Sequence, residues 1–182
     1  MVMTNQKPFL TDTQKLRRRM REQIEDGAVT PNYQGDVQGT IAILQGVLAS
    51  EIMCVLRYTM HAISATGINS EAVKIEFQTH ASEEHAHAIK VAERINQLGG
   101  TPNFNPEGMT SRSISEYGNA TDLVDMIKEN LIAERIAVEH YRDLVRHFAD
   151  DDPTTRVMLE GILSTEEEHA NDMHDLLAAH NG

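Results

Sequence analysis

Apolar residues recur at spacings of three and four along most of this chain, which is the period of one face of an α-helix. In residues 36–65, for example, Leu44, Val47, Leu48 and Val55 follow this spacing. The alternation of apolar and polar residues that is typical of β-strands does not occur along the sequence. The pattern therefore predicts an all-α protein.

The prolines and glycines divide the chain into helical segments, because proline inside a helix removes a hydrogen bond and clashes with the preceding turn. The 5 prolines lie at positions 8, 31, 102, 106 and 153, and Gly99 and Gly100 end one long segment. These breaks predict four long helices, over residues 36–65, 70–98, 121–148 and 153–180. Because the second connection is long, residues 99–120 form a crossover, and the four helices form a four-helix bundle.

A short helical extension is expected ahead of this bundle, within residues 11–26. It contains a basic cluster of Arg17, Arg18, Arg19 and Arg21. Two interpretations of the cluster stay open: a solvated basic face, or an arm that docks on another subunit or on DNA. We therefore expect two parts, an N-terminal extension over residues 1–35 and the helical bundle over residues 36–182.

The chain is acidic and contains a single cysteine. Its 28 Asp and Glu against 16 Lys and Arg give a net charge of -12, which disfavours binding to nucleic acid. Cys54 alone cannot form an internal disulfide, a zinc site or an iron–sulfur site. We expect no apolar segment long enough to span a membrane and no signal sequence in residues 1–10, and hence a soluble, cytoplasmic protein.

Each long helix carries one glutamate at a position where the apolar pattern predicts the protein core. Glu51, Glu134 and Glu166 project from apolar stripes, and Glu84 shares its helix face with both apolar residues and histidines. A lone carboxylate in an apolar interior is costly. The four glutamates are therefore expected to share a compensating partner.

Two of these glutamates are followed three residues later by a histidine, His87 after Glu84 and His169 after Glu166. Residues at this spacing lie on one helix face, so each pair can bind one ion. Four glutamates and two divalent ions balance in charge, and oxygen and nitrogen donors suit iron or manganese. The sequence predicts a two-metal site whose ligands, and catalytic residues, are Glu51, Glu84, His87, Glu134, Glu166 and His169.

The spacings repeat between the two halves of the bundle. Tyr58 follows Glu51 by seven residues, and Tyr141 follows Glu134 by seven. The two halves therefore look like a duplicated helix pair around a site of approximate two-fold symmetry. Each tyrosine is either a packed core residue or a hydrogen-bond partner of a ligand glutamate.

Other candidates are weaker. Cys54 is interpreted as a small core residue. The remaining candidates are interpreted as mostly solvated, although His80 could also support the ligands or lie on a route for ions; they are His61, His80, His85, His140, Glu167 and Glu168.

Four segments resemble bacterioferritin, within the ferritin-like superfamily. They are EIMCVLRY at residues 51–58, ASEEHAHAIKVAERINQLGGTP at 81–102, AER at 133–135 and TEEEHAND at 165–172. The resemblance covers about residues 36–180 and implies a ferritin-like four-helix bundle. It further implies that the six ligands hold two Fe ions per subunit, with manganese as the other possible metal, and that Glu84 and Glu166 bridge them.

The resemblance also implies an activity and an assembly. Such centres oxidise Fe(II) with oxygen or peroxide, and the ferric product is stored in a hollow shell of identical subunits, for which a 24-subunit cage is one form. His85 stands where bacterioferritin has a haem-ligating methionine, which makes haem doubtful. Tyr141 gives the third helix a spacing that is more similar to rubrerythrin.

We therefore expect a ferroxidase for iron storage and detoxification in a homo-oligomer. One alternative is a rubrerythrin-like peroxidase or manganese catalase, although the chain lacks paired cysteines for a rubredoxin-like electron donor. Another is a Dps-like DNA-protecting protein that uses the basic cluster of the extension. We rank this alternative lower, because Dps proteins normally bind iron between subunits, whereas the ligands predicted here lie within one bundle.

Overall fold

The computed structural model describes residues 12–68 and 70–181, and these contain six helices and no strand. The helices are α1 (Thr13–Glu22), α2 (Val37–Ser64), α3 (Ser70–Gln97), α4 (Met109–Arg112), α5 (Leu123–Phe148) and α6 (Pro153–Asn181). The all-α fold is confirmed, and the four long helices begin and end within two residues of the predicted limits.

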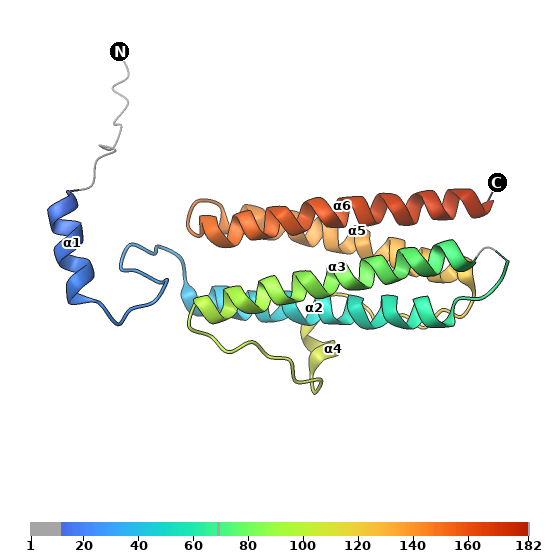
Figure 1. Ribbon diagram of the computed structural model, residues 1–182, viewed down its shortest axis with the longest axis horizontal. Coiled ribbons are helices and arrows are strands. Elements are labelled where there is room, and N and C mark those ends of the chain that lie inside the picture. The colour runs from blue at the N-terminus through green and yellow to red at the C-terminus, as the bar shows by residue number, and fades with distance from the viewer. Residues whose placement is uncertain (1–11, 69, 182) are drawn as a thin grey trace, which may run out of the picture.

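The four long helices run side by side as a bundle (Figure 1). The principal contacts join α2 to α3 and α5 to α6, so the bundle consists of two helix pairs that face one another. Local signals fix the helix ends. The side chain of Asp122 accepts hydrogen bonds from the backbone of Val124 and Asp125 at the start of α5. Gly99, with a φ of 86°, follows the end of α3.

Two large apolar clusters lie along the bundle axis, and a small third one packs Ala49 and Met53 of α2 against Met109 of α4. One contains Leu44, Leu48 and Ile95 among others, and the second contains Phe77 and Met126 among others. On every long helix, one stretch contributes to the first cluster and a separate stretch to the second. The predicted metal ligands lie between these two stretches in all four helices, so the bundle encloses a polar layer at its middle.

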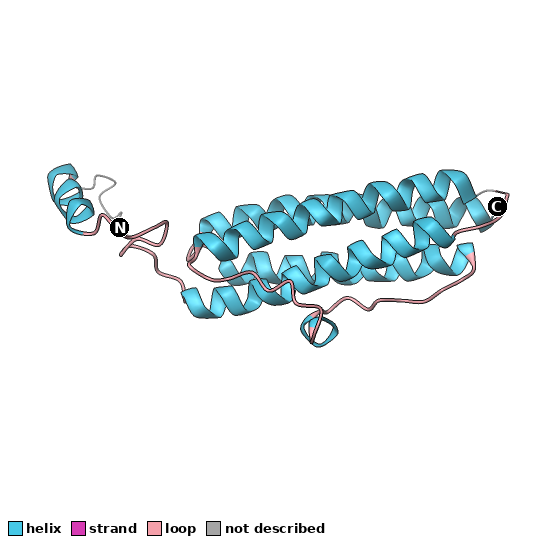
Figure 2. Ribbon diagram, turned by 60° about the horizontal axis from the view of Figure 1, so that its bottom comes forward, coloured by secondary structure: helices cyan, strands magenta, loops and turns pink. Residues whose placement is uncertain are grey.

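The crossover between α3 and α5 runs the length of the bundle, as predicted, and also contains the short helix α4 (Figure 2). The buried side chain of Arg57 on α2 holds it in place. Arg57 Nη1 donates to Ser115 Oγ at 2.8 Å and to the carbonyl oxygen of Glu116 at 2.7 Å, and Nε donates to Asn130 Oδ1 at 2.8 Å. A single guanidinium therefore ties the crossover to α2 and α5.

The helix α1 lies apart from the bundle (Figure 1). Its N-cap is Asp12, whose side chain accepts hydrogen bonds from two backbone amides of the first turn. The segment that follows α1 is tied to the bundle where the Tyr33 hydroxyl donates to Asp152 Oδ2 at 2.8 Å. Residues 1–11 of the expected extension lie outside the described residues, and its boundary at residue 35 stays a prediction.

Helix α2 is more apolar than the sequence analysis expected. It is long enough to cross a membrane, and an 18-residue window within Val37–Ser64 has a mean hydropathy of 1.8. The expectation that no segment would have this length and hydropathy was therefore wrong. Half of that window is buried inside the bundle, and α2 carries the buried Glu51. Its apolar character is that of the core helix of a bundle.

Candidate metal centre

Six ionisable side chains meet in the polar layer at the middle of the bundle. Each of them is at most 3% exposed to solvent. Helix α2 contributes one residue, α3 two, α5 one and α6 two; they are Glu51, Glu84, His87, Glu134, Glu166 and His169. The structure thus brings together every residue that the sequence analysis selected as a ligand.

His87 lies at the centre of one half of this group. Its Nδ1 atom is 3.0 Å from Glu166 Oε1, 3.4 Å from Glu51 Oε2 and 3.5 Å from Glu84 Oε2. The ligand atoms of these four residues all lie within 4.8 Å of one another. One nitrogen and three carboxylates therefore surround a common point.

His169 has the same place in the other half. Its Nδ1 atom is 3.7 Å from Glu84 Oε1 and 3.8 Å from Glu166 Oε2, and Glu134 completes a second set of four donors within 4.8 Å. The two sets share Glu84 and Glu166. The geometry is that of two adjacent metal positions with two carboxylates in reach of both.

The buried polar atoms of these residues test whether metal ions fit the site. Buried polar groups in folded proteins are almost always hydrogen-bonded. Among the described residues, however, seven atoms of the six side chains are buried without a hydrogen-bond partner: Glu51 Oε2, both Glu84 oxygens, His87 Nδ1, Glu134 Oε2, Glu166 Oε1 and His169 Nδ1. All seven are atoms that coordinate cations. The donor set, oxygen and imidazole nitrogen without thiolate, fits two iron or manganese ions.

Glu51 and Glu134 each belong to only one of the two sets, and we call them the outer glutamates. Each of them is held by a tyrosine from the opposite helix pair. The hydroxyl of Tyr58 on α2 donates to Glu134 Oε1 on α5, and the hydroxyl of Tyr141 on α5 donates to Glu51 Oε1 on α2. In both carboxylates the second oxygen is one of the unpartnered atoms. The tyrosines thus orient a free oxygen of each carboxylate, and the reciprocal arrangement agrees with the repeat in the sequence.

The pKa values of the carboxyls reflect their burial and their mutual repulsion. Burial and the negative charge of Glu84 raise the pKa of Glu51 to about 8. The same two causes raise the pKa of Glu134, and raise that of Glu166 well above its usual value. Burial alone would also raise the pKa of Glu84, but the adjacent imidazoles of His169 and His87 outweigh it and lower that pKa.

Burial by itself lowers the pKa of an imidazole, the opposite of its effect on a carboxyl. It disfavours the charged form of the two histidines, but the surrounding carboxylates dominate and raise the pKa of both His87 and His169 to about 9. At pH 7 the metal-free centre therefore contains protonated imidazoles and protonated carboxyls. Because metal ligands must be deprotonated, metal binding has to displace these protons.

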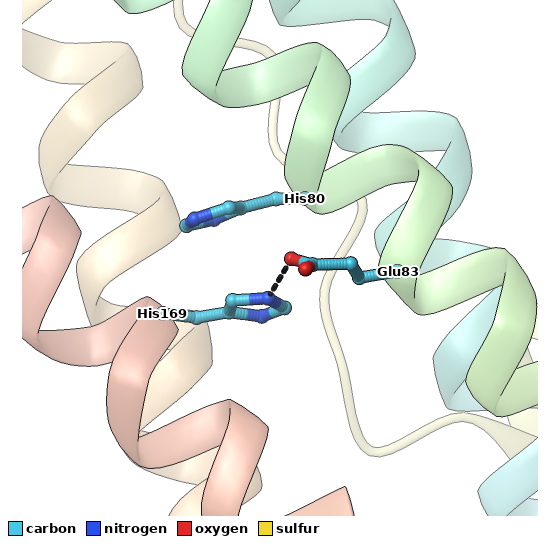
Figure 3. A group of neighbouring side chains, drawn as sticks. All are labelled: His80, Glu83 and His169. Atoms are coloured by element: carbon cyan, nitrogen blue, oxygen red, sulfur yellow. Dashed lines mark hydrogen bonds and ion pairs between the residues drawn. The ribbon is translucent and has the colours of Figure 1, made fainter.

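Behind His169 lies a further pair of side chains from α3 (Figure 3). Glu83 Oε2 is 2.8 Å from His169 Nε2, so this carboxylate accepts a hydrogen bond from the ring and leaves Nδ1 facing the centre. The ring of His80 stacks on that of His169 with 3.9 Å between their centroids. Burial, then the charge of His169, lower the pKa of His80 to about 3, so its ring is neutral.

The interpretation of the weaker histidines as mostly solvated was wrong for His61, whereas His80 lies against a ligand, as the alternative left open for it predicts. His80 and His61 are at most 1% exposed, because both project between helices. His61 Nδ1 lies 3.0 Å from Asn130 Nδ2, which places the ring beside the Arg57 network. His140 is half-buried and His85 is exposed.

Glu167 and Glu168 are exposed, as predicted, and Cys54 is a buried core residue, as predicted. The sequence analysis missed Glu83 and Arg57. Their contacts are to other helices and to the crossover, so periodicity along one helix carries no signal for them.

A small cavity adjoins the centre on the side covered by the crossover. Its volume is about 10 Å³, and its lining includes Glu51, Cys54, Ser115, His140 and Tyr141. A space of this size holds about one water-sized molecule. A small oxidant could therefore lie directly beside the carboxylates.

Known proteins of similar sequence and structure are ferritin-like. The profile of the ferritin-like domain matches residues 41–181. The DNA protection during starvation protein of Pyrococcus furiosus is 28% identical over 153 residues, which cover 78% of each chain. The dodecameric thioferritin of Bacteroides fragilis, a bacterioferritin-related protein, has a TM-score of 0.77 at 27% identity, covering 91% of this chain and 94% of that one. A ferritin-like, diiron-carboxylate protein of Bacillus anthracis has a TM-score of 0.68 at 27% identity, covering 78% of this chain and 96% of that one.

These similarities confirm the resemblance drawn from the sequence and widen it. They include a bacterioferritin-related protein, as expected. They also include a DNA protection during starvation protein, the class of protein that the sequence analysis ranked lower. Since the ferritin-like profile spans most of the sequence, the chain belongs to the ferritin-like family of iron-binding proteins.

Proposed function

We propose that this protein oxidises Fe(II) with hydrogen peroxide or oxygen at the buried centre, and so protects the cytoplasm from iron and oxidant together. The observation that carries this proposal is the pair of four-donor sets that share Glu84 and Glu166, with seven coordinating atoms unpartnered. A buried array of this kind is tolerable when two cations lie within it.

The side chains have distinct roles in this proposal. Glu84 and Glu166 hold the two metal positions at a short separation, and Glu51 and Glu134 each complete one position with the oxygen that its tyrosine leaves free. Two Fe(II) substrate ions supply two electrons, which reduce one hydrogen peroxide to two waters with the uptake of two protons. The anionic carboxylates favour the ferric product, because its charge is higher.

The product and the assembly are also part of the proposal. The Bacteroides relative is a dodecamer, and the Pyrococcus relative is named for DNA protection during starvation. These relatives favour a Dps-type homo-oligomer with a protective role over the 24-subunit bacterioferritin storage cage that the sequence led us to expect. In this assembly, the net charge of -12 would raise the local concentration of cations.

Loss of one outer glutamate tests the activity. The Glu134→Ala protein should keep its helical content yet oxidise Fe(II) at least about 100-fold more slowly, since one metal position loses its carboxylate. Glu139→Ala is the matched control, because Glu139 is an exposed residue of the same helix whose ion pair with Arg142 contributes little. Equal oxidation rates in the two variants, measured by stopped-flow absorbance, would refute the proposal.

Measurement of peroxide consumption distinguishes the proposed ferroxidase from the remaining enzymatic alternative. A peroxidase or manganese catalase turns over peroxide without consuming Fe(II). We expect peroxide consumption to stop when about one peroxide per two Fe(II) has reacted. Continued consumption after Fe(II) is exhausted would favour the alternative.

Association with DNA is a second candidate function, favoured by the basic cluster of α1. Arg17, Arg18 and Arg21 are exposed on this helix, which lies apart from the acidic bundle. The separation allows the guanidinium groups to reach a phosphate backbone although the net charge of the chain opposes binding.

A gel shift at low salt tests this candidate. Simultaneous replacement of Arg17, Arg18 and Arg21 by Gln should abolish any DNA binding, while replacement of the exposed bundle residues Lys90 and Lys128 by Gln should not. If both variants bind as the unaltered protein does, α1 is not a DNA-binding arm.

A further inference from the structure

A second cluster of ligand-type side chains lies next to the metal centre, towards the surface. His80 follows Glu76 by four residues on α3, and Asp172 on α6 faces them from the other helix pair. His80 Nε2 is 3.3 Å from Glu76 Oε1 and 3.6 Å from Asp172 Oδ2. None of these three residues belongs to the six ligands of the centre.

The cluster joins the interior to the solvent. The side chain of His80 is 1% exposed, whereas those of Glu76 and Asp172 are 35% and 45% exposed. A hydrated cation can therefore reach the two carboxylates from outside and meet the imidazole nitrogen on the inner side.

The hydrogen bonds of His80 determine which of its nitrogens is free to coordinate. The Tyr58 hydroxyl donates its one hydrogen to Glu134, so its oxygen accepts from His80 Nδ1, which is 3.1 Å away. With Nδ1 engaged in this contact, Nε2 is the ring nitrogen that can coordinate. Within the described part of the chain, Nε2 faces two carboxylates and no hydrogen-bond donor. Two carboxylate oxygens and one imidazole nitrogen that converge in this way offer three ligand atoms to a cation.

Glu83 connects this cluster to the centre. Its carboxylate, His80 and His169 present ligand atoms that all lie within 4.8 Å of one another (Figure 3). Glu83 accepts a hydrogen bond from His169, whose other ring nitrogen faces the centre. Side chains that can coordinate a metal ion therefore follow one another from the solvent to a ligand of the centre.

We propose that Glu76, His80 and Asp172 form a third metal site, which binds one divalent transition-metal ion on its way into the centre. Two carboxylates balance the charge of one divalent ion, and the imidazole favours Fe(II), Mn(II), Co(II) or Zn(II) over Mg(II) and Ca(II). The binding of this third ion stands independently of the chemistry at the centre. Its role in loading rests on the proposed function.

The test counts metal ions in the intact assembly. Metal-free protein is titrated with Co(II) in a calorimeter, comparing the double variant Glu76→Gln/Asp172→Asn with the unaltered protein. The control is Glu93→Gln/Glu168→Gln, which removes one exposed carboxylate from each of the same two helices. The double variant should bind one Co(II) fewer per chain than both other proteins and retain the two ions of the centre.

The outcomes separate this inference from the proposed function. If the double variant and the control bind equally many ions, or if the unaltered protein binds two, the third site does not exist, although the centre stands. If the unaltered protein binds fewer than two, the proposed function fails. In the loading role, the double variant oxidises limiting Fe(II) more slowly but to the same final amount, and an unchanged rate refutes that role.

Discussion

Removal of metal should destabilise the bundle strongly, because the metal-free centre leaves seven buried atoms without hydrogen-bond partners. An ion that binds the folded state at about 100 times its dissociation constant adds about 2.7 kcal/mol to the free energy of unfolding. Two such ions therefore add about 5 kcal/mol. For a chain of this length, 1 kcal/mol corresponds to about 2–4 °C in Tm, so saturation should raise Tm by about 10–20 °C.

The assay is thermal unfolding followed by circular dichroism, first with a chelator and then with excess Mn(II), which avoids oxidation. A pair of variants on α6 shows whether the rise in Tm comes from metal bound at the centre. Glu166→Met replaces a shared carboxylate by an apolar side chain of similar length, and Glu168→Met makes the same change at an exposed position.

The two variants should behave differently. Glu166→Met should unfold, when metal-free, at a temperature at least as high as the unaltered protein, since a buried carboxyl with a raised pKa and an unpartnered oxygen has been replaced by an apolar group. It should also lose most of the response to Mn(II), whereas Glu168→Met should keep it. A rise in Tm of less than a few degrees in the unaltered protein, or an equal rise in Glu166→Met, would refute the reasoning.

Four further predictions depend on the same geometry. Because burial and charge interactions raise the pKa of Glu51 from 4.5 to about 8 and surrounding carboxylates raise those of His87 and His169 from 6.5 to about 9, the metal-free protein should lose stability as the pH rises, from about 4.5 to 8 through Glu51 and from about 6.5 to 9 through the two histidines. Metal binding at pH 7 should accordingly release protons, measured by calorimetry in buffers of different ionisation enthalpy, and no release would contradict these pKa values. Tyr141→Phe should weaken metal binding by about 10–100-fold, since Glu51 loses the donor that orients it; an unchanged Co(II) affinity would show that the hydroxyl is dispensable. Arg57→Met should lower the free energy of unfolding by about 3–5 kcal/mol in urea denaturation, because it leaves several buried acceptors unpaired, and a loss below 1 kcal/mol would contradict the role of Arg57 in holding the crossover.

The positions of the helices and of the six central residues could be predicted because they depend on local rules. Proline and glycine mark helix ends, and a period of 3.6 residues determines which side chains face inward. Glu51, Glu134 and Glu166 stood out because a carboxylate contradicts the apolar stripe around it. The burial of all three follows from that stripe.

The features that could not be predicted depend on contacts between helices. His80 is buried because it stacks on a ring from α6, and Arg57 is buried because its partners lie on the crossover and on α5. Neither contact leaves a periodic signal along its own helix. Likewise, the pairing of Tyr58 with Glu134 requires knowledge of which helices face one another.

The central claim is that the six buried side chains surround two cations. Crystals soaked with Fe(II) under anaerobic conditions, and measured at the iron absorption edge, test it most directly. The account predicts two anomalous peaks about 3.5–4 Å apart, with Glu84 and Glu166 in contact with both and one histidine on each. An interior without anomalous density, or side chains that turn from the centre towards solvent, would contradict it.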